Sequence, residues 1–185
     1  MIKTLLLYTF VIFAAISTAM ALKPEPRFFF DEEQSGNGTF SSDDTYCMAL
    51  NIYHEARNDN LAGKFAVSDV VFNRMLDARY PDTICGVVQQ AKLSKWHLSE
   101  GREVPIRNKC QFSWFCDGLS DEPRNGKSWD ESRLIAKNFL TYGEYRGITE
   151  GATHYHAIYV EPNWATSKGM HMIGRIGEHI FYRWK

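Results

Sequence analysis

The spacing of apolar and polar positions predicts two long helices in the first half of the chain. Apolar residues recur every three or four positions up to about Asn58, and again from about Leu61 to Tyr80, where Pro81 ends the pattern. Ser42 or Asp43 is a suitable N-cap for the first of these helices. Adjacent amphipathic helices of this kind are expected to pack together as the hairpin at the centre of the core.

The second half begins with shorter and less regular patterns. A short third helix is predicted over 84–91, whereas 92–109 has no steady period and is interpreted as a surface loop. The sequence S-W-D-E at Ser128 is typical of a capping box, and the helix that it begins is expected to stop at Gly143.

Strand-like alternation appears only near the C-terminus. Side-chain character alternates over 153–158, and 179–184 is again typical of a strand, which predicts a small antiparallel sheet. Because the helices come first and the strands last, the predicted fold class is α+β.

The N-terminus has the features of an export signal. Lys3 precedes an uncharged and mostly apolar run from Thr4 to Ala21 that ends in A-M-A, which predicts a signal peptide over 1–21. An uncleaved membrane anchor is the alternative, since such a run is close to the ~20 residues that cross a bilayer. Either interpretation predicts an exported protein, in the periplasm, the cell wall or the extracellular space.

The remaining 22–185 divides into a linker and one domain. Pro, Gly and acidic residues over 22–42 are typical of a tether, and 43–185 is expected to fold as the single domain. The 185 residues are 44% hydrophobic, which is enough for one core. A net charge of −1 lacks the basic excess of a nucleic-acid-binding protein, and a monomer is the default expectation.

Four cysteines in an exported chain of this size favour disulfides. Three pairings are possible. Cys110 and Cys116 are close in sequence, so a small loop between them is expected, with Cys47 paired to Cys85. No C-x-x-C pair is present, and a zinc site built from these cysteines is not expected.

Glu55 is the candidate for acid chemistry. Met48, Ile52 and Glu55 share one face of the first helix, so this carboxyl group follows two apolar side chains toward the core. Apolar surroundings raise the pKa of a carboxyl group, which can then hold a proton at neutral pH and donate it. A simpler alternative is an ion pair of Glu55 with Arg57 or Arg74 at the edge of the core.

Six motifs together resemble one family. In order along the chain they are Y-H-E-A-R (53–57), A-V-S-D-V-V-F-N-R (66–74), Y-P-D-T-I-C-G-V-V (80–88), C-Q-F-S-W-F-C-D-G (110–118), G-A-T-H-Y-H-A (151–157) and I-G-E-H-I-F-Y-R (176–183). The sequence resembles the SleB-type cell wall hydrolases, the family of the spore-cortex-lytic enzymes. This resemblance implies a lysozyme-like or lytic-transglycosylase-like domain that acts on peptidoglycan glycan strands, with Glu55 as catalytic acid.

Two features of the resemblance bear on mechanism. Family members often have Gly-Glu where this chain has Asn58 and Asp59, so a role for that second acid is open. Hydrolysis of a glycosidic bond normally uses two carboxylates, and the sequence offers no obvious partner for Glu55. A lytic transglycosylase can use one acid that later acts as base, and this mechanism is favoured for cleavage between MurNAc and GlcNAc.

Substrate contacts are predicted from residue chemistry. Gln111 and Ser113 could hydrogen-bond sugar hydroxyls, while Trp114, Tyr155 and Trp164 could stack on sugar rings, although core packing explains each ring equally well. His154 or His156 could hydrogen-bond near Glu55 and tune its acidity.

Two other classes of function stay open. His54, His154 and His156 would suit a zinc amidase or peptidase, but H-E-A-R lacks the second His of H-E-x-x-H, so neither a metal nor any other cofactor is expected. A wall-binding module without catalysis is the other alternative. The sequence does not separate a bacterial remodelling enzyme from a phage endolysin.

Overall fold

A computed structural model describes residues 40–185. The predicted signal peptide and the linker up to residue 39 lie outside the described residues. The elements in chain order are α1 (Ser42–Ala56), α2 (Leu61–Leu76), α3 (Ile84–Val88), β1 (Ala91–Leu93), α4 (Lys95–Ser99), β2 (Pro105–Cys110), η1 (Ser113–Cys116), α5 (Lys127–Lys137), η2 (Asn138–Tyr142), β3 (His154–Ala157), η3 (Asn163–Thr166), β4 (Met170–Ile176) and β5 (His179–Trp184). Within this part of the chain, no helix has the length and apolar character needed to cross a membrane.

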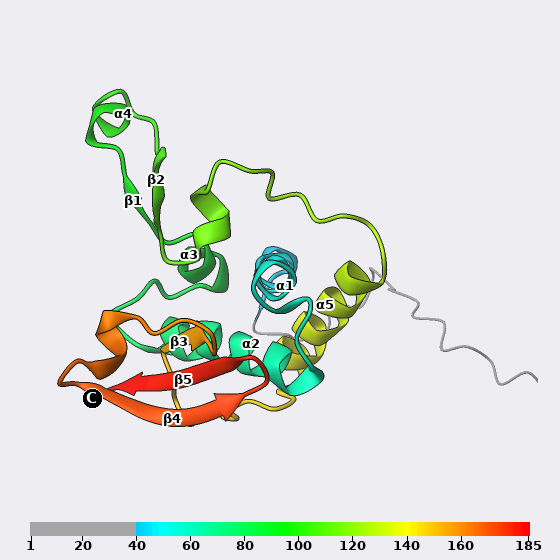
Figure 1. Ribbon diagram of the computed structural model, residues 1–185. Helices are drawn as coiled ribbons and strands as arrows, with labels where there is room; N and C mark the ends of the chain where they lie inside the picture. Colours follow the sequence, from blue (N-terminus) through cyan, green and yellow to red (C-terminus); the bar gives the residue numbers. More distant parts are fainter. Residues whose placement is uncertain (1–39) are drawn as a thin grey trace, which may run out of the picture. The chain divides into compact units, whose positions relative to one another are not determined.

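Helix α1 lies at the centre of the helical part, with α2, α3 and α5 packed around it (Figure 1). Its inner side chains Met48 and Ile52 are completely buried. The helix begins with a capping box in which Ser41 Oγ accepts from the Asp44 backbone N–H and Asp44 accepts from the Ser41 backbone N–H. The N-cap is therefore Ser41, and not Ser42 or Asp43 as predicted.

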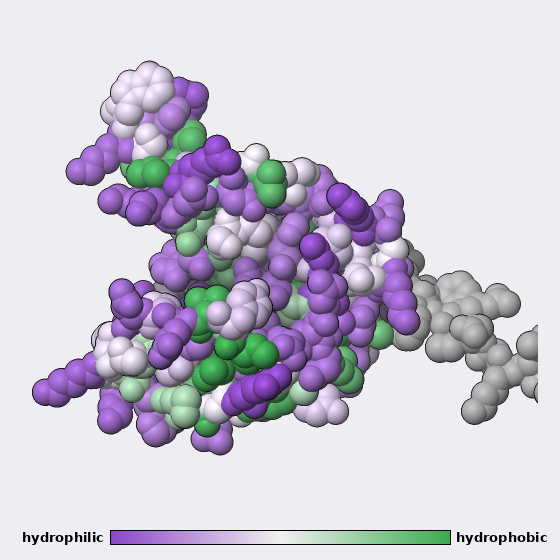
Figure 2. Space-filling view, in the orientation of Figure 1, coloured by the Kyte–Doolittle hydropathy of each residue, from purple (hydrophilic) through white to green (hydrophobic). Residues whose placement is uncertain are grey.

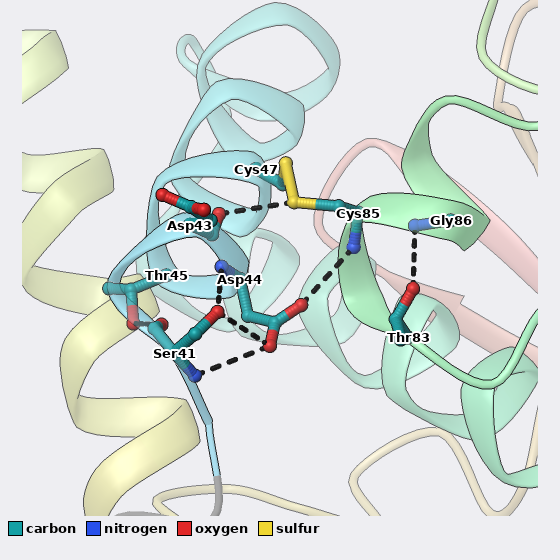
Figure 3. The surroundings of a disulfide bond; sticks show 8 residues. All are labelled: Ser41, Asp43, Asp44, Thr45, Cys47, Thr83, Cys85 and Gly86. Atoms are coloured by element: carbon teal, nitrogen blue, oxygen red, sulfur yellow. Dashed lines mark hydrogen bonds between the residues drawn. A yellow bond between two sulfur atoms is a disulfide. The ribbon is translucent and has the colours of Figure 1, made fainter.

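The disulfide Cys47–Cys85 joins α1 to α3, as predicted, with the two Cα atoms 5.2 Å apart (Figure 3). The Asp44 carboxylate lies beside this bond and accepts from the Cys85 backbone N–H at 3.4 Å. The start of α1 is thus fixed to α3 by one covalent and one polar contact.

Two predicted helix ends are wrong. Helix α2 ends at Leu76 instead of Tyr80, because Asp77 is already extended and its carboxylate accepts from the Arg79 backbone N–H. Helix α3 ends at Val88, and Ala91 already belongs to β1.

The predicted capping box at Ser128 is also wrong. The N-cap of α5 is Gly126, two residues before Ser128; its φ of 140° favours glycine, and no side chain caps the helix. The predicted stop is confirmed, since Gly143 adopts the left-handed conformation that ends η2.

The loop predicted over 92–109 is wrong, because it forms a projecting arm. Strands β1 and β2 pair antiparallel, with Ala91 opposite Cys110 and Leu93 opposite Pro105, and α4 forms the tip (Figure 1). The predicted disulfide Cys110–Cys116 closes the base of the arm onto η1. The surface is hollowed between this arm and the C-terminal sheet (Figure 2).

The predicted antiparallel sheet is present and has strand order β3-β5-β4. His154 lies opposite Tyr182 in the β3–β5 pair, and Met172 lies opposite Tyr182 in the β4–β5 pair. Strand β4 was not predicted. The sheet packs on α2. Phe181 of β5 and Ala152, just before β3, form a buried cluster with Ala66 and Val70 of α2. Helices followed by a small antiparallel sheet confirm the α+β class.

Candidate active site

Glu55 lies in the last turn of α1, one residue before the helix ends. The Tyr155 hydroxyl, from β3, donates a hydrogen bond to Glu55 Oε2 over 3.1 Å. Burial raises the pKa of the Glu55 carboxyl group, and the Tyr155 hydrogen bond and the charge of Arg74 oppose that rise. The carboxyl group therefore favours its protonated form more than an exposed glutamate does.

The alternative ion pairs of Glu55 do not form among the described residues. The Arg57 guanidinium lies 5.2 Å from the centre of the Tyr53 ring, and Arg74 Nε donates to the Thr153 carbonyl over 2.7 Å. Arg74 therefore influences Glu55 only as a nearby charge.

A pocket of about 310 Å³ surrounds Glu55 at the end of α1, between that helix and the sheet. It is lined by His54, Glu55, Ala56, Arg57, Asn58, Asp59, Ala157, Tyr159, Glu178 and His179. A larger pocket of about 1170 Å³ adjoins it, with His54, Arg57 and Asn58 in both linings. The larger pocket does not include Glu55, so the acid chemistry belongs to the smaller one, and the two together offer an extended binding path.

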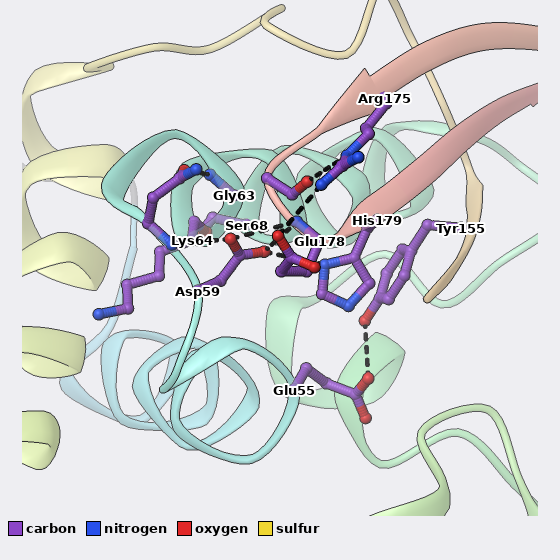
Figure 4. Close-up of polar contacts among 11 residues, drawn as sticks. Glu55, Asp59, Gly63, Lys64, Ser68, Tyr155, Arg175, Glu178 and His179 are labelled. Atoms are coloured by element: carbon purple, nitrogen blue, oxygen red, sulfur yellow. Dashed lines mark hydrogen bonds and ion pairs between the residues drawn. The ribbon is translucent and has the colours of Figure 1, made fainter. Parts of the chain in front are cut away.

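Asp59 and His179 form a polar pair in the lining of this pocket. His179 Nδ1 and Asp59 Oδ2 are 3.1 Å apart, and the same carboxylate accepts from the Glu178 backbone N–H at 3.0 Å (Figure 4). Only 3% of the Asp59 side chain is exposed. The pair thus fixes the turn between α1 and α2 to the turn between β4 and β5.

Two glycines make room for the Asp59 carboxylate. A Cβ atom added to Gly63 would lie 2.2 Å from one Asp59 oxygen, and one added to Gly177 would lie 2.3 Å from the other. Gly177 also has a φ of 60°, which favours glycine. Any side chain at either position would displace the carboxylate.

His179 is also in contact with the residue that holds Glu55. Its ring centre lies 5.1 Å from that of Tyr155, in an edge-to-face arrangement. Burial lowers the pKa of His179, and the hydrogen bond and charge of Asp59 oppose this change. Burial thus shifts His179 toward its neutral form and Glu55 toward its protonated form.

The residues predicted on the disulfide loop do not line the pocket that contains Glu55. Trp114 is buried, donates through Nε1 to Asn51 Oδ1 over 3.2 Å, and stacks on His54 with ring centres 4.5 Å apart. It lines the larger pocket. Gln111 and Ser113 are exposed and line neither pocket.

Alternation along β3 separates the remaining predicted residues. Tyr155 points toward Glu55, whereas His156 lies on the other face of the strand and is 3.0 Å from the Tyr182 hydroxyl through Nε2. The Trp164 ring lies on that face too, 5.7 Å from His156. The structure brings Tyr155 to Glu55 as a hydrogen-bond donor. The sugar-binding roles of all these residues stay predictions.

The three histidines of the zinc alternative do not come together. His54 Nε2 lies 3.0 Å from the Asp121 carbonyl oxygen, while His154 bonds Thr153 and His156 bonds Tyr182. Burial, with the charges of Arg74 and Arg79, lowers the pKa of His154 to about 4. Among residues 40–185, no three His, Cys, Asp or Glu side chains are grouped as metal ligands.

Sequence reasoning missed the pairing of Asp59 with His179. The two residues are 120 positions apart, and only their occurrence after Y-H-E-A-R and within I-G-E-H pointed to them. Gly177, which directly precedes Glu178 and His179, was the available local signal for a tight approach of the backbone.

Comparison with known proteins places the chain in a family. The model of the cell wall hydrolase family matches residues 58–182, and the chain belongs to that family. The matched range begins after Glu55. The chain is 28% identical over 147 residues to the spore cortex-lytic enzyme of Bacillus subtilis (strain 168), and the match covers 78% of this chain and 39% of that protein. It is 27% identical over 145 residues to the spore cortex-lytic enzyme of Bacillus cereus, and this match covers 77% of the chain and 45% of that protein.

The chain thus spans less than half the length of these curated relatives. Its fold is similar to that of the catalytic domain of the germination-specific lytic transglycosylase SleB from Bacillus anthracis, with a TM-score of 0.50 and 21% identity over 80% of this chain and 100% of that one. This likeness confirms the predicted lysozyme-like fold.

Proposed function

We propose that this protein is an exported enzyme that cleaves the glycan strand of peptidoglycan between MurNAc and GlcNAc. The observation that carries the proposal is the Glu55 carboxyl group, whose pKa is raised by burial, in a pocket that continues into a larger one. Membership of the cell wall hydrolase family supports the substrate class.

Cleavage of a glycosidic bond needs a proton on the bridging oxygen while an oxocarbenium-like centre develops at the sugar. Protonated Glu55 supplies that proton. In the simplest lytic scheme the same carboxylate then removes the proton from the C6 hydroxyl of muramic acid, which closes on C1 to give the 1,6-anhydro product. The adjoining pockets would hold successive sugars of the strand on either side of the cleaved bond.

The test is digestion of purified sacculi by the full chain with both disulfides formed. Glu55→Gln should remove activity, by about 10²-fold or more, because the amide cannot donate a proton to the leaving oxygen. Glu103→Gln is the matched control, since this exposed glutamate lies in the arm and undergoes the same change of charge. A Glu55→Gln enzyme that digests sacculi at the wild-type rate would refute the proposal.

A further inference from the structure

His179 presents one ring nitrogen to the pocket that contains Glu55. Nδ1 faces Asp59, while the opposite nitrogen, Nε2, points to the side on which Glu55 and the Tyr155 hydroxyl lie (Figure 4). No described residue makes a hydrogen bond to Nε2, and His179 lines the pocket. This nitrogen is therefore available to a ligand.

Asp59 determines which nitrogen of His179 carries the hydrogen. A carboxylate only accepts hydrogen bonds, so Nδ1 must donate to Asp59, and in the neutral ring Nε2 is left with a free lone pair. The carboxylate itself cannot rotate away, because it accepts the Glu178 backbone N–H and is enclosed by Gly63 and Gly177. The imidazole is thus held as a base aimed into the pocket.

We propose that His179 is the second catalytic group of this pocket, whose Nε2 removes the hydroxyl proton during cleavage, with Asp59 as the positioning residue for the ring. The inference rests on the proposed function, and it assigns the second proton transfer to His179 instead of Glu55. It gives Glu55 a partner for the second proton transfer, which the carboxylates of the sequence did not reveal.

In lytic cleavage, Glu55 donates one proton and His179 accepts another. Glu55 gives its proton to the bridging oxygen as the bond from that oxygen to C1 of muramic acid breaks. The C6 oxygen forms the new bond to C1, and its proton passes to Nε2. His179 then releases a proton to solvent and Glu55 takes one up, which restores both groups for the next cycle.

Several charged or titratable groups lie near His179 and enter its pH dependence. They are Asp59 between α1 and α2, Glu178 before β5, Tyr155 and His156 on β3, and Glu55 and Arg57 in the shared pocket lining. Glu178 also pairs with Arg175 of β4. Of these, Asp59 makes the hydrogen bond to the ring, so its removal should have the largest effect on the pKa of His179.

The first test is the pH profile of kcat for the wild-type full chain on sacculi. A protonated acid and a neutral imidazole acting together give a bell-shaped profile, whereas Glu55 acting alone gives only a loss with rising pH. Asp59→Asn removes a group that raises the pKa of His179, so the acidic limb should move to lower pH and kcat should fall about tenfold or more. His179→Gln should lower kcat by about 10²-fold and abolish the acidic limb.

Asp69→Asn controls for loss of packing. Asp69 is another buried carboxylate that accepts backbone N–H groups, from Gly147 and Thr149, but it does not line the pocket. This variant should lose thermal stability and keep the wild-type pH profile. Any of three results would overturn the inference. They are a wild-type profile without an acidic limb, an acidic limb that Asp59→Asn does not move, and a folded His179→Gln enzyme with wild-type kcat. Glu55→Gln would still be inactive in each case, so the proposed function is judged separately.

Discussion

The Tyr155 hydroxyl donates a hydrogen bond to Glu55 Oε2 over 3.1 Å, and this bond joins β3 of the sheet to the last turn of α1. The bond favours ionised Glu55, because a carboxylate accepts a hydrogen bond better than a carboxylic acid does. Tyr155 therefore counteracts part of the rise that burial causes in the pKa of Glu55.

Tyr155→Phe should raise the pKa of Glu55 further and move the alkaline limb of kcat to higher pH. The loss of one hydrogen bond should cost about 1 kcal/mol of stability. The pH profile of sacculus digestion measures the shift, with Tyr142→Phe as the exposed control. An alkaline limb that moves to lower pH would contradict the role assigned to Tyr155.

Glu55→Gln should make the protein more stable at neutral pH while it removes activity. The pKa of Glu55 is higher in the folded state than its ordinary value of 4.5, so the unfolded chain ionises first. The stability contributed by the neutral carboxyl group is complete below that ordinary value and is lost as the pH rises through the folded pKa. Thermal unfolding should show equal Tm values near about pH 4 and a higher Tm for the variant near about pH 7. Equal Tm values at both would contradict the burial of Glu55.

Gly63→Ala should destabilise the protein, although alanine normally stabilises a helix by about 1 kcal/mol over glycine. The added Cβ would lie 2.2 Å from an Asp59 oxygen and displace the carboxylate that holds His179. Urea unfolding measures the effect on stability. The double variant Asp59→Ala and Gly63→Ala removes the clash, so Gly63→Ala should be much less harmful in that background; purely additive effects would argue against the contact.

The two disulfides should contribute unequally to stability. Cys47–Cys85 closes a loop with a sequence separation of 38, and Cys110–Cys116 one of 6. Chain entropy gives about 4 kcal/mol for the first and about 2 kcal/mol for the second. Paired replacement of each by Ala, followed by urea unfolding, should give the larger loss for Cys47 and Cys85. The reverse order would mean that loop size does not govern their contribution.

Periodicity predicted the parts of the fold that local sequence determines. Both long helices and the alternation around Tyr155 follow from the spacing of apolar side chains. The arm formed by β1 and β2 was missed because its strands are short and depend on a non-local pair, Ala91 opposite Cys110. The false capping box at Ser128 has the right residue types, but the N-cap of the helix is Gly126, whose unusual φ no local rule revealed.

The candidate site, too, has parts that local sequence predicts and parts that only the folded chain brings together. The buried position of Glu55 was predictable because Met48 and Ile52 lie on the same helix face, whereas its catalytic role stays a prediction. Asp59 and His179 meet across 120 positions, and two glycines allow that contact, so only the folded chain brings them together. His156 was assigned near Glu55 from its residue type, whereas strand alternation places it on the opposite face from Tyr155.

Mass spectrometry of the soluble products from purified sacculi tests the central claim most directly. The full chain with its disulfides formed should release fragments that end in 1,6-anhydromuramic acid, as expected for glycan cleavage with Glu55 as proton donor. Reducing muramic acid ends would mean that the same glycosidic bond is cleaved by hydrolysis, with water in place of the C6 hydroxyl as the attacking group. Freed stem peptides with intact glycan strands would contradict the account.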